Sequence, residues 1–85
     1  MAEERLRQLL HALHDELGRT ARLDTRVEAD LREIMEDIRG ALDRAEPGAH
    51  EGLRERLSQS LDDFATDHPR LALSVRRMID TMSRL

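Results

Sequence analysis

The apolar residues of this 85-residue chain recur with a period of 44 residues, and this repeat narrows the possible folds. Within each repeat the apolar positions are mostly three, four or seven residues apart. This is the spacing of one face of an α-helix, and a break midway separates two such stripes. The repeat therefore predicts two tandem helix–turn–helix units. The coinciding pairs are Leu9 and Leu53, Leu13 and Leu57, Leu17 and Leu61, Val27 and Leu71, Leu31 and Val75, Ile34 and Met78, Met35 and Ile79, and Ile38 and Met82.

The predicted fold is all-α, a small four-helix bundle built from two antiparallel helical hairpins within one domain, residues 1–85. Hairpin one covers residues 2–45 and hairpin two covers residues 51–85. The segment 46–50 between them is the expected linker. Pro47 disfavours helix at the preceding residue, and Gly48 allows backbone conformations that end a helix.

Local signals place the ends of the helices. The first helix is predicted over residues 2–19 and the third over residues 51–65. Thr25 and Glu28 have the spacing of a capping box, so Thr25 is the expected N-cap of the second helix.

The join between the third and fourth helices is predicted at Asp67-His68-Pro69. Asp67 or His68 would be the N-cap, and proline is tolerated in a first helical turn because its missing N–H needs no partner there. The alternative is that Pro69 only kinks one long helix. The 44-residue shift aligns this join with the turn before Thr25 and favours a reversal.

Motifs for catalysis or metal binding are weak. His11 and His14 are three residues apart on the first helix but have no partner in a Glu-x-x-His or His-Glu-x-x-His pattern. The neighbouring acids Asp62 and Asp63 would point about 100° apart on a helix and are expected to face solvent. The chain also has no cysteine. The sequence therefore predicts neither an enzyme nor a bound cofactor or metal.

The apolar runs are too short to predict a membrane span, and the acidic N-terminus does not resemble a secretory signal, so we expect a cytoplasmic protein. The number of large apolar side chains is marginal for a stable monomer, which favours self-association as a dimer or larger oligomer. Leu73 supports this expectation because it lies nearly opposite the apolar stripe of the fourth helix, although a single exposed leucine is also common on protein surfaces.

Charge is distributed unevenly along the chain. Residues 68–85 carry four arginines and one aspartate, a net charge of +3, whereas residues 1–67 carry ten arginines and seventeen acids, a net charge of −7. Arg76 and Arg77 join Leu73 as the candidate interface, either with a second copy or with an unidentified protein. The alternative is a regulator that binds nucleic acid or another polyanion through this helix. The overall charge of −4 and the lack of aromatic residues for base stacking argue against nucleic acid.

A set of short motifs runs along nearly the whole chain, and its most specific element is Phe64 followed by His68-Pro69-x-Leu71. The other segments are Leu9-Leu10-x-x-Leu13-His14-x-Glu16-Leu17, Leu23-Asp24-x-Arg26, Asp37-Ile38 and Ile79-Asp80. With these motifs the chain resembles a small bacterial family known only as domain of unknown function 4404. The resemblance implies a short, cytoplasmic, helical protein and implies no activity, ligand or catalytic residue. Together, residues and resemblance favour a homo-oligomeric or protein-interaction module without catalysis.

Overall fold

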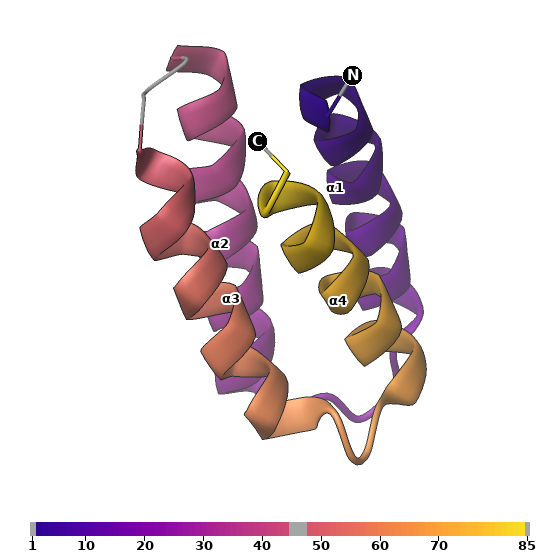
Figure 1. Cartoon of the computed structure of the whole chain (residues 1–85). Coiled ribbons are helices and arrows are strands. Elements are labelled where there is room, and N and C mark those ends of the chain that lie inside the picture. The colour runs from indigo at the N-terminus through magenta and orange to yellow at the C-terminus, as the bar shows by residue number, and fades with distance from the viewer. Residues whose placement is uncertain (1, 45–47, 85) are drawn as a thin grey trace.

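The computed structural model describes residues 2–44 and 48–84, which form four helices. Figure 1 shows the chain running down one helix and up the next, so that the helices lie side by side in a bundle of 35 × 20 × 18 Å. The predicted all-α four-helix bundle is confirmed. Part of the expected linker, Glu46 and Pro47, lies outside the described residues. The helices are α1 (Ala2–Arg19), α2 (Thr25–Arg44), α3 (Ala49–Phe64) and α4 (Pro69–Met82).

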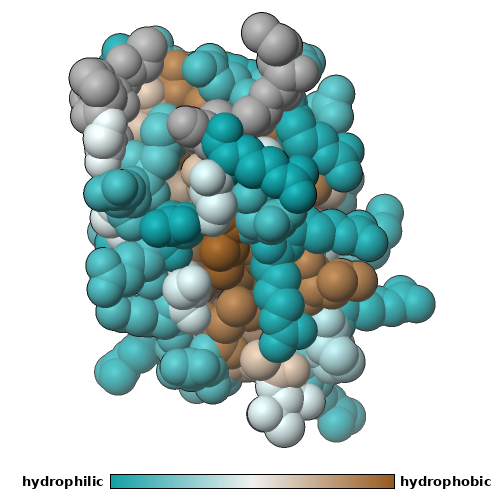
Figure 2. All heavy atoms as spheres, viewed as in Figure 1, coloured by the Kyte–Doolittle hydropathy of each residue, from teal (hydrophilic) through white to brown (hydrophobic). Residues whose placement is uncertain are grey.

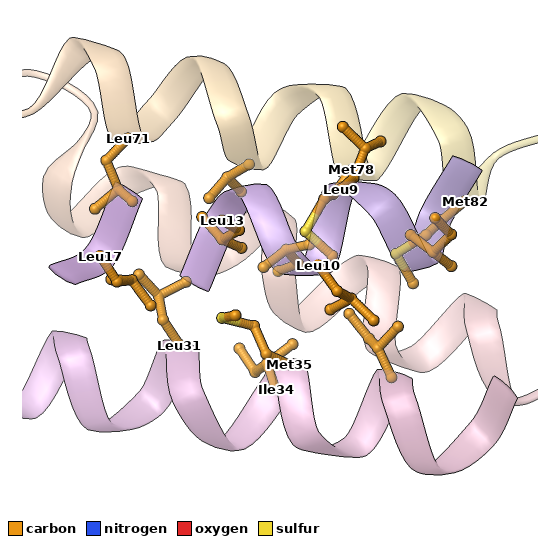
Figure 3. Close-up of a cluster of buried hydrophobic side chains, with 14 of the residues drawn as sticks. Leu9, Leu10, Leu13, Leu17, Leu31, Ile34, Met35, Leu71, Met78 and Met82 are labelled. Atoms are coloured by element: carbon orange, nitrogen blue, oxygen red, sulfur yellow. The ribbon is translucent and has the colours of Figure 1, made fainter. Parts of the chain in front are cut away.

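The core is formed by the apolar stripes that the repeat identifies. Figure 3 shows these side chains from α1, α2 and α4 pointing toward one another along the bundle. Phe64, the only aromatic residue of the chain, is buried at the end of α3. The stripe of α3 is thinner, because Leu53 and Leu61 are only partly buried against the core. Fully buried side chains include Leu6, Leu13, Leu17, Leu31, Ile38, Leu57, Leu71, Val75 and Met78.

The four helices are not equally close. α1 packs closely on α4, α2 on α3, and α3 on α4, whereas α1 and α2 approach each other at few positions. The two helices of hairpin one are thus neighbours along the chain and yet form the most open seam of the bundle.

The start of α2 corrects one prediction, because Asp24 and not Thr25 is its N-cap. The Asp24 carboxylate oxygen Oδ1 accepts hydrogen bonds from the backbone N–H groups of Arg26 at 2.8 Å and Val27 at 3.4 Å. The carbonyl of Asp24 accepts the first helical bond, from the N–H of Glu28 at 2.9 Å. Thr25 is already the first residue of the helix. The capping-box spacing alone placed the cap one residue late.

The join between α3 and α4 is a reversal and not a kink (Figure 1). Residues 65–67 form a turn, His68 occupies the N-cap position, and Pro69 is the first helical residue. The His68 side chain makes no capping hydrogen bond. Its backbone N–H instead donates to the carbonyl of Phe64 at 2.9 Å, and its carbonyl accepts from the N–H of Ala72 at 3.0 Å. The turn is therefore held by backbone bonds and by the fixed φ of proline.

Candidate functional site

The outer face of α4 carries the candidate interface residues. Leu73 is 48% exposed, the one large apolar side chain in the described part of the chain with such exposure. It points away from the buried Leu71 and Val75 because positions two residues away lie roughly on the opposite side of a helix. Figure 2 shows apolar surface gathered between α3 and α4 and over α4, among hydrophilic side chains.

Arginines surround Leu73 on this face. Arg70, Arg76 and Arg77 are exposed, and none of them forms an ion pair within residues 2–44 and 48–84. The remaining arginine of α4 differs, since Arg84 lies 3.0 Å from the carboxylate of Asp80. Since no described residue accepts a hydrogen bond from these three guanidinium groups, their donors are suited to an external partner.

An acidic stripe lies beside this basic face on α3. Glu51, Glu55 and Asp62 are exposed and have no ion pair among the described residues. Glu51 and Glu55 line a furrow between the two helices that also exposes part of Ile79 on α4. One surface of the bundle therefore presents a negative stripe on α3 and a positive stripe on α4, and the furrow between the helices is lined by Arg54, Ser58 and the exposed part of Ile79 as well as by the two glutamates.

A second concave feature lies on the open seam between α1 and α2. It is a groove of about 150 Å³ with Leu10 and Met35 as its apolar floor. Four residues from each helix line it. They are Arg7, Leu10, His11 and His14 from α1, and Arg32, Met35, Glu36 and Arg39 from α2.

The groove residues differ in how firmly they are held. Arg39 donates two hydrogen bonds to the Glu36 carboxylate, and this hydrogen bonding lowers the pKa of Glu36 below its ordinary value of 4.5. Arg7 bridges from α1 to Asp43 of α2 at 3.0 Å. The contacts of Arg32 are longer, 3.4 Å from its Nη1 to His14 Nδ1.

A family model matches residues 6–85, nearly the whole chain, and its description is domain of unknown function (DUF4404). The chain belongs to the DUF4404 family. The family resemblance seen in the sequence is thus confirmed. No curated protein and no solved structure matches this chain.

In this DUF4404 chain the sequence-predicted residues do not gather at one place. Leu73, Arg76 and Arg77 share the outer face of α4, whereas Asp67, His68 and Pro69 form the turn that precedes it. Within the described ranges no three His, Asp or Glu side chains are arranged to hold a metal ion. No described helix is long and apolar enough to cross a membrane.

The sequence analysis missed the groove of this DUF4404 chain, because it considered His11 and His14 only as a possible metal-binding pair on one helix. A signal was present. Arg7, His11 and His14 are spaced i, i+4 and i+7, and the groove residues of α2 repeat this spacing from Arg32 onward. When two consecutive helices pack side by side and each has polar residues at this spacing beside its apolar stripe, these polar residues line the two sides of the contact between the helices.

Proposed function

We propose that this protein is a self-associating interaction module that joins copies through the surface formed by α3 and α4, and that it has no catalytic role. The observation that carries the proposal is the exposed Leu73 among the unpaired arginines of α4. Burial of an exposed leucine is favourable, and guanidinium groups without internal partners are suited to a charged partner surface. We expect the protein to act in the cytoplasm.

Charge complementarity favours a second copy as the partner. If two copies meet about a twofold axis parallel to the helices, α4 of each copy lies over α3 of the other. Arg76 and Arg77 then face the stripe of Glu51, Glu55 and Asp62 twice in the same interface. Such an isologous contact is closed, so it gives a dimer and not a filament.

The surface is large enough for such a contact. A standard interface buries about 800 Å² on each partner, roughly a seventh of this chain's exposed surface of 5671 Å². The α3–α4 surface is one long side of the bundle, about 35 by 20 Å or roughly 700 Å² in flat area before the relief of its side chains is counted, so the contact would use most of that side. The core of the contact would be Leu73, Ile79 and the exposed part of Leu61.

A single substitution tests the association. Leu73→Glu places a charge in the centre of the proposed contact and should raise the dimer dissociation constant by tenfold or more, measured by sedimentation equilibrium at micromolar concentration. Ala29→Glu adds the same charge to an exposed position of α2 and should leave the constant unchanged. Circular dichroism should show that both variants remain helical. A wild-type chain that stays monomeric at high concentration contradicts the proposal.

Mixing two charge-reversed variants tests the orientation. Arg76→Glu with Arg77→Glu makes both stripes acidic, and Glu55→Arg with Asp62→Arg makes both stripes basic. Each variant alone should be monomeric because like charges face each other. An equimolar mixture should form a heterodimer, since each of its two contacts then joins opposite charges. Failure of the mixture to associate would contradict the α3–α4 contact.

Polyanion binding through the same arginines is the competing function. Heparin chromatography separates the two, because a polyanion site retains the wild type and releases it at increasing salt. Retention that is lost in the Arg76→Glu, Arg77→Glu variant, together with a monomeric wild type, would favour the regulator over the interaction module.

A further inference from the structure

The groove between α1 and α2 shares no lining residue with the proposed α3–α4 contact. Its two walls have the same pattern, because the lining residues of α1 and those of α2 occupy positions i, i+3, i+4 and i+7. In each wall the i+3 residue is apolar, Leu10 or Met35, and reaches the floor. The polar residues of each wall form the rim. This arrangement gives a pocket with an apolar base and a charged mouth, the usual composition of a small-molecule site.

The rim is rich in hydrogen-bond donors. It contains the guanidinium groups of Arg7, Arg32 and Arg39, one carboxylate from Glu36, and the imidazoles of His11 and His14. Each of the three arginines contacts one carboxylate, Arg7 that of Asp43, Arg32 that of Glu28 and Arg39 that of Glu36, so the rim offers donors to a ligand and not an excess of positive charge. Arginine has five N–H donors, and the internal contacts of these arginines use only some of them. The rim therefore offers unused donors to an anion.

Arg32 is the residue best placed to anchor an anion. Arg39 is fixed by two hydrogen bonds to Glu36, and Arg7 is bound to Asp43 at 3.0 Å. Arg32 has only longer contacts, 3.5 Å to Glu28 and 3.4 Å to His14. A carboxylate that replaces these contacts could form a bidentate pair with the guanidinium, which is the stronger geometry.

The volume limits the size of the ligand. A cavity of about 150 Å³ in a protein core accommodates a benzene ring, and the groove has this volume above Leu10 and Met35. We propose that the groove binds a small carboxylate with a ring-sized apolar body, with the body on the floor and the carboxylate at Arg32 and His14. A ligand of this size binds weakly, with a dissociation constant on the order of 1 mM.

Nuclear magnetic resonance titration with benzoate as the probe tests the site at constant ionic strength. Benzoate should cause saturable shifts of the backbone amides of Leu10, His14, Arg32 and Met35. Benzyl alcohol keeps the ring without the charge, and acetate keeps the charge without the ring. Each should bind at least fivefold more weakly than benzoate, because the proposal needs both the floor and the rim.

Two matched variants locate the charge requirement. Arg32→Gln should weaken benzoate binding about tenfold, since it removes the anchoring charge. Arg26→Gln removes the same charge from an exposed position of α2 outside the groove and should leave binding unchanged. The proposal is overturned if benzoate gives no saturable shifts at the groove, if benzyl alcohol binds equally well, or if the two variants weaken binding equally. Because the α3–α4 variants leave the groove intact, failure of self-association does not affect this result.

Discussion

Replacement of Asp24 by alanine is the most direct check on how α2 begins. The Asp24 carboxylate accepts two backbone N–H groups at the first turn of a 20-residue helix. Loss of an N-cap costs about 1 kcal/mol in most proteins, and loss of a negative charge near a helix N-terminus costs about 0.3–1 kcal/mol more at an exposed site. We expect Asp24→Ala to lower the free energy of unfolding by about 1.5 kcal/mol.

Two further variants separate the causes. Asp24→Asn keeps a capping oxygen and loses the charge, so it should cost only about 0.5 kcal/mol. Thr25→Ala should have the opposite sign. Thr25 is exposed at the first helical position, where alanine has the higher helix propensity, and the change should stabilise the protein by a few tenths of a kcal/mol.

Urea unfolding followed by far-ultraviolet circular dichroism measures these differences. All variants should be compared at one protein concentration, because self-association would make the apparent stability depend on concentration. For a domain of this size a loss of 1.5 kcal/mol corresponds to a fall in melting temperature of roughly 6–12 °C. If Thr25→Ala destabilises the protein more than Asp24→Ala does, Thr25 is the cap and the account of this turn is refuted.

Other changes test the core, the second turn and the groove. Phe64→Ala should lower the free energy of unfolding by about 3–5 kcal/mol, a large share of the stability of a small domain, and its thermal unfolding transition should be broad. Phe64→Leu should remain folded and unfold cooperatively. His68→Asn should unfold at nearly the wild-type urea concentration because the histidine makes no capping bond, whereas Pro69→Gly should cost about 1 kcal/mol by freeing the unfolded chain. The lowered pKa of Glu36 means that its bond to Arg39 stabilises the folded state above pH 4.5 and is lost as the pH falls through the lowered value. Glu36→Gln should therefore lose less stability than the wild type on acidification through that range, and an equal loss would count against this bond.

The helix starts could be predicted from the sequence to within two residues, because they depend on local chemistry and on the repeat; the largest error is at α3, which begins at Ala49 and not at the predicted residue 51, inside the expected linker. α2 begins at Thr25 and α4 at Pro69, and these residues are 44 positions apart, as the apolar repeat requires. The N-cap residue itself was predicted one position late. Asp24 and Thr25 are both good caps, so residue type alone does not distinguish them, and the structure shows that the Asp24 carboxylate accepts the N–H groups of the first turn.

The groove could not be predicted in the same way, because it depends on how closely particular pairs of helices approach. Small buried residues allow close approach where α2 meets α3. Asp37 of α2 and Arg56 of α3 form an ion pair at 2.8 Å across this contact. One helical turn after each of them lies a small buried residue, Ala41 on α2 and Ser60 on α3. Small side chains such as these favour close packing of two helices, and α2 does pack closely on α3.

The seam between α1 and α2 lacks such small residues. Its apolar contacts come from long side chains such as Leu10 and Met35, and Arg7, Arg32 and Arg39 extend over them from both sides. Guanidinium groups keep their charge in water while their stems cover apolar surface, so these arginines cover the apolar floor and connect the two helices at the rim, as Arg7 does with Asp43 at 3.0 Å. The same residues therefore supply the hydrogen-bond donors of the groove. For this reason the groove between α1 and α2 combines an apolar floor with the donors that a small anion with an apolar body needs.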